Sequence, residues 1–216
     1  MTATDKDALV DLLGALAYGE LSAFDRLAHD ARRAPSLSGR AAMAGMAAVE
    51  LGHHGSLIDR LRHLGADPEE AMEPFVAALD RFHAKTEPST WHESLVKAYV
   101  GDGLAADFYR EVARFVDPST RELITEVLAD SGSAAFAVRE VLTATAATPS
   151  LSGRLALWGR RLVGEAISQT QHVLAERDAL MTLLMSDTGD ISGVGTLMTR
   201  ITDNHARRMT TLGLGG

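Results

Sequence analysis

The chain has 216 residues, no cysteine and a formal net charge of −8 at pH 7. This length suits one domain with its own hydrophobic core, and the lack of cysteine excludes disulfides, thiol catalysis and iron–sulfur clusters. The acidic balance disfavours general nucleic-acid binding, and no apolar run is long enough to cross a bilayer. We therefore expect a single domain, residues 1–216, in the cytoplasm and without a membrane segment.

Apolar residues recur at spacings of three and four along almost the whole chain, which predicts an all-α fold. Clusters of proline, glycine and serine divide this pattern into separate helices. Asp67-Pro68 and Asp117-Pro118 give the clearest starts, because a capping acid before a first-turn proline is typical of a helix N-terminus. In chain order, the predicted helices span residues 5–33, 37–64, 68–85, 89–116, 118–147, 150–185 and 190–211.

Four of these helices have an acidic residue in the middle of the apolar stripe that should face the core. The acids are Glu20, Glu50, Asp102 and Asp130, one each on the helices predicted at 5–33, 37–64, 89–116 and 118–147. In a bundle of long antiparallel helices, these acids should lie at a similar depth. Burying unpaired carboxylates is costly, so a converging set needs a compensating positive charge.

A bound metal ion is one source of that charge. His53 follows Glu50 by three residues and lies on the same helical face, although His54 competes as the inward histidine. Carboxylate and imidazole ligands suit iron or manganese, and a glutamate plus an E-x-x-H pair from each half of a bundle can hold two metal ions. The pattern therefore predicts metal ligands at Glu20, Glu50, His53, Asp102 and Asp130. The alternative is structural: each acid pairs with an arginine.

Five segments around these residues resemble a known family. They are Tyr18–Phe24, Val49–His53, Leu95–Gly103, Ala105–Glu111 and Leu155–Ala166. They resemble actinobacterial ferritin-like proteins grouped with the tRNA-(2-methylthio-N6-isopentenyladenosine) hydroxylase, and the resemblance extends over nearly the whole chain. It implies a ferritin-like four-helix bundle built from the helices at 5–33, 37–64, 89–116 and 118–147, with a crossover helix at 68–85 and extra C-terminal helices.

The resemblance also implies a function and a role for each ligand. Glu20, Glu50 and His53 would be the ligands of the first half of the site, and Asp102 the bridging acid of the second half. The implied protein is a non-haem di-iron hydroxylase or oxidase that uses O₂. Its expected substrate is a small molecule or a modified tRNA, and its expected assembly is a homodimer.

The sequence departs from the family pattern at Ser133, where a histidine is expected three residues after Asp130. Serine is a poor metal ligand, so three arrangements remain open. They are an asymmetric di-iron site completed by water, a single ion on Glu20, Glu50, His53 and Asp102, and a relic bundle whose acids pair with arginine. The alternative function is therefore a non-catalytic ferritin-like metal-binding or interaction protein.

A second alignment takes the missing ligands from the helix at 150–185. There Glu165, Gln169 and His172 fall on a polar stripe that we interpret as surface. Tyr109 follows Asp102 on its stripe and either lines the site or packs in the core. The remaining histidines lie at predicted helix edges or ends and are interpreted as solvated or capping residues: His29, His63, His83, His92 and His205.

Overall fold

The computed structural model describes residues 3–128, 133–185 and 192–215. Within these ranges the regular structure is helical, with no strand, which confirms the predicted all-α fold. Two short 3₁₀ helices, η1 (Ala31–Arg33) and η2 (Ala113–Phe115), follow the first and fourth α-helices. The α-helices are α1 (Ala3–Asp30), α2 (Leu37–His63), α3 (Pro68–Lys85), α4 (Trp91–Val112), α5 (Pro118–Val127), α6 (Ser133–Ala147), α7 (Ser150–Glu176), α8 (Asp178–Met185) and α9 (Ser192–Thr211).

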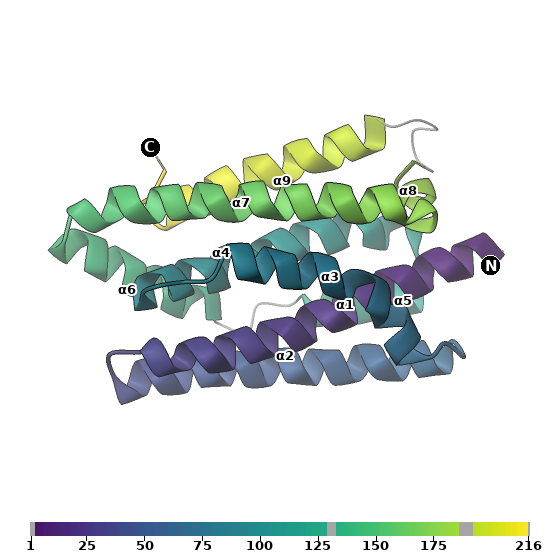
Figure 1. Ribbon diagram of the computed structural model, residues 1–216, viewed down its shortest axis with the longest axis horizontal. Helices are drawn as coiled ribbons and strands as arrows, with labels where there is room; N and C mark the ends of the chain where they lie inside the picture. Colours follow the sequence, from purple (N-terminus) through teal and green to yellow (C-terminus); the bar gives the residue numbers. More distant parts are fainter. Residues whose placement is uncertain (1–2, 129–132, 186–191, 216) are drawn as a thin grey trace.

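The long helices lie roughly along one axis (Figure 1). Helices α1 and α2 form an antiparallel hairpin along one side, and α7 and α9 lie along the opposite side, with α3 and α4 between them (Figure 1). Helix α3 packs against both α1 and α7, whereas α4 packs against α6, α7 and α9. Glu20 of α1, Glu50 of α2 and Asp102 of α4 line one cavity, where the α1–α2 hairpin meets α4.

The two clearest predicted helix starts are confirmed. The Asp67 carboxylate accepts hydrogen bonds from the backbone N–H groups of Glu69 and Glu70, at 2.8 and 3.1 Å. Asp117 does the same at the start of α5, with both backbone N–H donors 3.1 Å away. These bonds satisfy N–H groups that have no partner within the helix, so the chain starts a helix at each proline that follows.

Two predicted helices are each divided in the structure. The predicted helix at 118–147 is described as α5, which ends at Val127, and α6, which begins at Ser133, and residues 129–132 between them lie outside the described residues. The predicted helix at 150–185 breaks at Arg177. The Arg177 guanidinium forms a salt bridge with Asp11 of α1, including an Nε–Oδ2 bond of 3.0 Å, which fixes the turn between α7 and α8.

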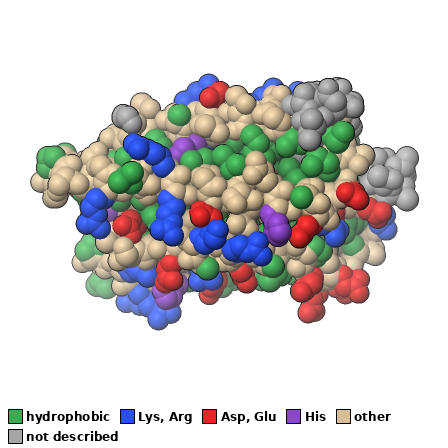
Figure 2. Space-filling view, turned by 45° about the horizontal axis from the view of Figure 1, so that its top comes forward, with side chains coloured by type: hydrophobic (Ala, Val, Ile, Leu, Met, Phe, Trp, Pro, Cys, Tyr) green, Lys and Arg blue, Asp and Glu red, His purple; other side chains and the backbone are tan. Residues whose placement is uncertain are grey.

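No helix among the described residues is both long and apolar enough to span a bilayer. On the face shown in Figure 2, basic side chains lie among acidic ones and do not form a continuous positive surface. Apolar side chains fill the space between the helices instead, in one cluster that contacts every long helix.

Helices α1 and α3 approach most closely at Gly14. A Cβ atom on this residue would lie 2.0 Å from the carbonyl oxygen of Ala71, which is backbone and cannot rotate away. The hydrogen side chain of glycine therefore sets the distance between α1 and α3, and with it the position of the α3 residues that line the site.

We expect Gly14→Ala to lower the free energy of unfolding by about 1–3 kcal/mol, because the added methyl group forces α1 and α3 apart. Gly45→Ala on α2 is the matched control, since a Cβ there meets no atom within 4 Å. It should raise the free energy of unfolding by roughly 0.5–1 kcal/mol through helix propensity alone. Denaturant unfolding measures both values, and equal effects of the two substitutions would refute the close approach.

Candidate metal centre

The α1–α2 hairpin brings Glu20, Glu50 and His53 together. One potential ligand atom from each residue lies within 4.8 Å of the other two. His53 Nδ1 is 3.5 Å from Glu20 Oε2 and 3.6 Å from Glu50 Oε2. Among residues 3–128, 133–185 and 192–215, no other group of three acidic or histidine side chains has this geometry. The E-x-x-H spacing on α2 and one glutamate on α1 therefore form a compact half-site, as the sequence pattern predicts.

Burial makes this cluster costly for the protein without a cation. Burial raises the pKa of Glu20, and the negative charge of Asp102 raises it further. Burial also raises the pKa of Glu50 to about 9, and the neighbouring Glu20 carboxylate adds to the increase. Glu50 thus keeps its proton at neutral pH, because two carboxylates this close resist ionising together.

Two atoms of the cluster lack hydrogen-bond partners. Glu20 Oε2 and His53 Nδ1 are buried, and neither has a partner among the described residues. Within the same part of the chain, no arginine forms a salt bridge with Glu20 or Glu50, so the structural alternative of separate arginine pairs does not apply to them. Buried polar atoms normally have partners, and two carboxylates with one imidazole are a donor set that fits iron or manganese. The residues present therefore fit a metal ion.

Asp102 lies next to this half-site on α4. It lines both of the cavities that Glu50 lines, and its charge acts on Glu20. Its side chain is exposed, although the sequence pattern predicted an inward position. Asp102 therefore lies at the exposed rim of the site.

The second half-site is not completed by the described residues. Asp130, the fifth predicted ligand, lies outside them. The residues of α5 and α6 that line the cavity with Glu50, His53 and Asp102 are apolar, namely Val127, Ala134 and Ala137. The structure thus brings together three of the five predicted ligands, with Asp102 beside them.

His54, the rival of His53, has a different role. Its Nδ1 atom lies 2.8 Å from the backbone carbonyl oxygen of Ala17 on α1. This hydrogen bond ties α2 to α1 one helical turn from Glu20. The two neighbouring histidines therefore have different roles. His53 faces the carboxylates, and His54 connects the two helices of the hairpin.

The alternative ligands on α7 do not form a metal cluster. Glu165 pairs with Lys85 at 3.1 Å, and His172 pairs with Glu176 at the surface at 3.4 Å. Gln169, however, is only 7% exposed, so its assignment to the surface is wrong. The cause is α3, which packs against α7 and places Leu79 and Phe82 beside Gln169.

Sequence reasoning missed a polar group of α3 and α4 that lines the same cavity as Glu20. This cavity has a volume of about 150 Å³. His83 Nε2 lies 3.2 Å from Ser22 Oγ, and burial lowers the His83 pKa to about 3, so the ring is neutral. Lys97 is buried and donates a hydrogen bond of 2.8 Å to the carbonyl oxygen of Thr86, and burial lowers its pKa to about 8.

His83, interpreted from the sequence as a solvated or capping residue, instead lines the cavity and contacts Ser22. A sequence signal existed, because Phe75, Leu79 and Phe82 form an apolar stripe on α3 that His83 continues at helical spacing. His205 was also interpreted as solvated, yet it is only 6% exposed.

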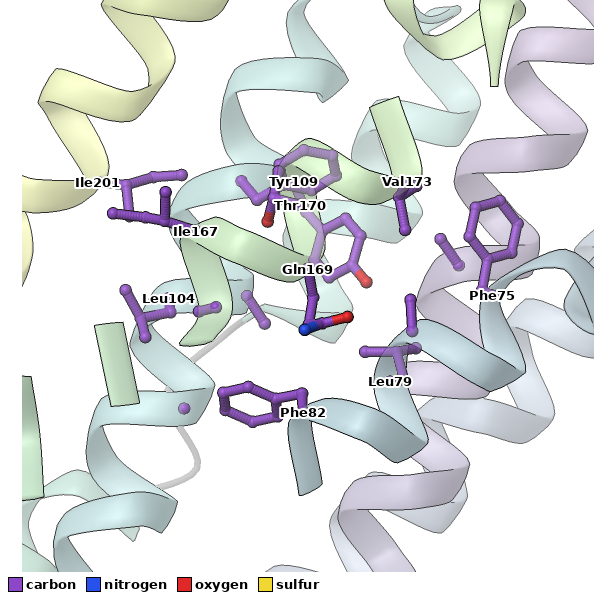
Figure 3. A pocket seen from close by; sticks show the side chains of 16 residues that line it. Phe75, Leu79, Phe82, Leu104, Tyr109, Ile167, Gln169, Thr170, Val173 and Ile201 are labelled. Atoms are coloured by element: carbon purple, nitrogen blue, oxygen red, sulfur yellow. The ribbon is translucent and has the colours of Figure 1, made fainter. Parts of the chain in front are cut away.

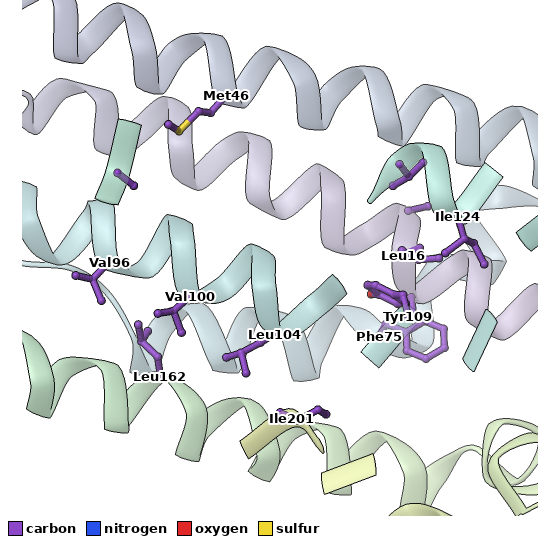
Figure 4. Close-up of a cluster of buried hydrophobic side chains, with 14 of the residues drawn as sticks. Leu16, Met46, Phe75, Val96, Val100, Leu104, Tyr109, Ile124, Leu162 and Ile201 are labelled. Atoms are coloured by element: carbon purple, nitrogen blue, oxygen red, sulfur yellow. The ribbon is translucent and has the colours of Figure 1, made fainter. Parts of the chain in front are cut away.

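A second, apolar cavity of about 160 Å³ adjoins the first (Figure 3). The two cavities share a wall made of Leu79, Phe82, Gly101, Ala105 and Tyr109. Tyr109 is buried in the same apolar cluster as Leu16 and Phe75 (Figure 4). Burial raises the Tyr109 pKa, and the Glu20 carboxylate raises it further, so the phenol stays protonated beside the acids.

The fold and the site define a helical bundle with a buried carboxylate–histidine cluster. A profile of the family described as "Ferritin-like domain, actinomycetes" matches residues 3–187, and the chain belongs to this family. The ferritin-like fold predicted from the resemblance is thereby confirmed. No curated protein matches the sequence.

A solved structure supports the same fold. It is described as protein 19 with aldehyde deformylating oxidase activity from Synechococcus. It superposes on this chain with a TM-score of 0.69 at 20% sequence identity, over 98% of this chain and 92% of that one. At this identity the similarity shows the fold alone, but it includes α9, which lies beyond the family match.

Glu50→Gln should stabilise the metal-free protein at pH 8 to 9. A carboxyl group whose pKa is raised on folding contributes stability at acidic pH and loses it as the pH rises through the folded pKa, here about 9. Glutamine stays neutral and avoids that loss, so the melting temperature of the variant should exceed that of the wild type by a few degrees, an advantage that shrinks towards pH 5. Glu73→Gln, at an exposed position on α3, is the control and should change nothing. A lower melting temperature for Glu50→Gln at pH 9 would contradict the assignment.

Proposed function

We propose that the chain is a non-haem iron protein that oxidises a small, largely apolar substrate with O₂, as a hydroxylase or oxidase. The observation on which this proposal rests is the cluster of Glu20, Glu50 and His53 beside an apolar cavity. Within it Glu20 Oε2 and His53 Nδ1 lie 3.5 Å apart, and neither atom forms a hydrogen bond among the described residues. The membership in a ferritin-like family supports it, as does the oxidase activity in the description of the structurally similar protein.

Glu20, Glu50 and His53 would hold the first ion, with Asp102 in position to contribute at the rim. Iron bound there supplies the electrons that O₂ activation requires. Glu50 has to release its proton for this binding, because its raised pKa keeps it protonated at neutral pH. The apolar wall that includes Leu79 and Phe82 keeps water away from the reacting side of the site.

A small molecule suits the site better than a modified tRNA. The apolar cavity is almost without polar surface, and the mixed charges of the face in Figure 2 give no continuous path for a phosphate backbone. The tRNA substrate and the homodimer remain predictions from the sequence resemblance. Manganese is the alternative metal, since the same ligand types accept it.

A non-catalytic metal-binding protein is the second candidate. The observation that favours it is the apolar lining that α5 and α6 give to the site, together with serine at position 133. On this alternative, the chain binds one ion through the first half-site and does not react with O₂.

We expect the protein reconstituted with Fe²⁺ under anaerobic conditions to retain at least one ion per chain after desalting. His53→Ala should lose it, because the substitution removes one of the three side chains that offer ligand atoms in the cluster. His54→Ala is the matched control: it removes the hydrogen bond to Ala17 but should retain the metal. Metal analysis by mass spectrometry gives the ratios. A wild-type protein without metal, or a His53→Ala protein with it, would end the proposal.

Oxygen consumption separates the two functions. Iron-loaded wild-type protein, given a reductant and a set of small apolar hydrocarbons, alcohols and aldehydes, should consume O₂ and incorporate or transfer oxygen, followed with ¹⁸O₂ by mass spectrometry. Asp102→Asn should reduce this rate roughly tenfold or more, because it removes one negative ligand at the rim. Stable iron binding with no substrate-dependent O₂ consumption would favour the non-catalytic alternative.

A further inference from the structure

Gln169 is a polar residue in the largely apolar wall of the second cavity. It lies on α7 and is only 7% exposed, and its side chain extends into the space near Phe82 and Leu79 (Figure 3). The rest of the lining is mostly aliphatic or aromatic, with contributions from α1, α3, α4, α7 and α9. Examples are Phe75, Leu104, Ile167, Val173 and Ile201.

Among the described residues, nothing shows that the Gln169 amide stabilises the fold. Its Oε1 atom is buried and has no hydrogen-bond partner among them. An unpaired buried acceptor destabilises the folded protein, and a leucine of similar volume would fill the same place without that cost. The amide is therefore explained best by a partner that enters the cavity from outside.

The size and chemistry of the cavity restrict that partner. The volume of about 160 Å³ is close to the roughly 150 Å³ of an apolar cavity that takes up benzene. Since the wall is apolar, the body of the ligand must be apolar too. An unpaired carbonyl oxygen needs a hydrogen-bond donor, and a hydroxyl group is a donor that adds no charge to an apolar ligand.

We propose that this cavity is a binding site for a compact apolar alcohol or phenol, whose hydroxyl group donates a hydrogen bond to Gln169 Oε1. The cavity shares a wall, including Tyr109 and Ala105, with the cavity of Glu20 and Glu50. A ligand held at Gln169 therefore lies beside the candidate metal centre. That this ligand is the substrate rests on the proposed function, whereas its binding does not.

The test uses metal-free wild-type protein and three probes of similar size, namely phenol, anisole and benzene. Anisole retains the oxygen but lacks the donor, and benzene lacks both. Isothermal titration gives the three dissociation constants for the wild type and for Gln169→Leu. The preference for phenol is defined as the dissociation constant of benzene divided by that of phenol. Comparing this ratio between the wild type and Gln169→Leu cancels the hydration free energies of the probes, which are the same for both proteins.

We expect Gln169→Leu to reduce the preference for phenol by roughly three- to tenfold, as for the loss of one hydrogen bond. Benzene should bind the variant at least as well as the wild type, which also shows that the variant is folded. Anisole should behave as benzene does in both proteins. An unchanged preference, or a preference for anisole equal to that for phenol, would overturn the proposal.

Two controls locate the effect. Thr170→Val removes the neighbouring hydroxyl from the same wall and should leave the preference unchanged. Ile201→Phe fills the cavity from α9 and should weaken all three probes together. Failure of the wild type to bind any probe would overturn the proposal as well. Iron content of Gln169→Leu, which should equal that of the wild type, tests the metal centre separately, so the two proposals can fail independently.

Discussion

The structure depends on the burial of two carboxyl groups between α1 and α2. Glu20 and Glu50 lie with His53, and among the described residues no arginine forms a salt bridge with either carboxylate, so their charge must be removed by a proton or balanced by a cation. The raised pKa of Glu50 is the first solution, and a bound metal ion is the second. A cluster that destabilises the metal-free protein is typical of a functional site, because packing alone would favour apolar residues there.

The helices outside the α1–α2 hairpin give the cluster its surroundings. Helix α3 is held against α1 at Gly14 and provides Phe82 and His83. Helix α9 is held on α4 by Asp107, which accepts hydrogen bonds from Arg208 at 2.6 Å and Asn204 at 3.0 Å. These contacts place the cavity lined by Glu20 and Glu50 and the cavity lined by Gln169 on two sides of one wall. The added helices thus form part of the site and not merely a covering of the bundle.

The sequence predicted the features that depend on one helix or on neighbouring helices. Helical spacing places Glu50 and His53 on one face, and an apolar stripe marks Glu20 as inward. The sequence did not predict that Gln169 is buried or that His83 lines a cavity, because these positions depend on the packing of α3 against α7 and α1, which joins distant parts of the chain. Asp102 shows the opposite error, since it is exposed although most residues of its stripe, such as Leu95 and Tyr109, are buried.

The two cavities favour different surroundings, one polar and one dry, and this difference restricts the kind of molecule that the site can bind. The metal cavity requires ionised carboxylates, whose charge favours contact with water or a cation, whereas the apolar cavity requires a dry wall. Tyr109 lies in the wall between the two cavities and suits both. Its ring belongs to the apolar cluster, and its phenol stays protonated beside Glu20. A substrate whose apolar body and single hydroxyl match the second cavity would displace water from the shared wall as it binds. The carboxylates would then act on it in a less polar medium, where electrostatic interactions are stronger.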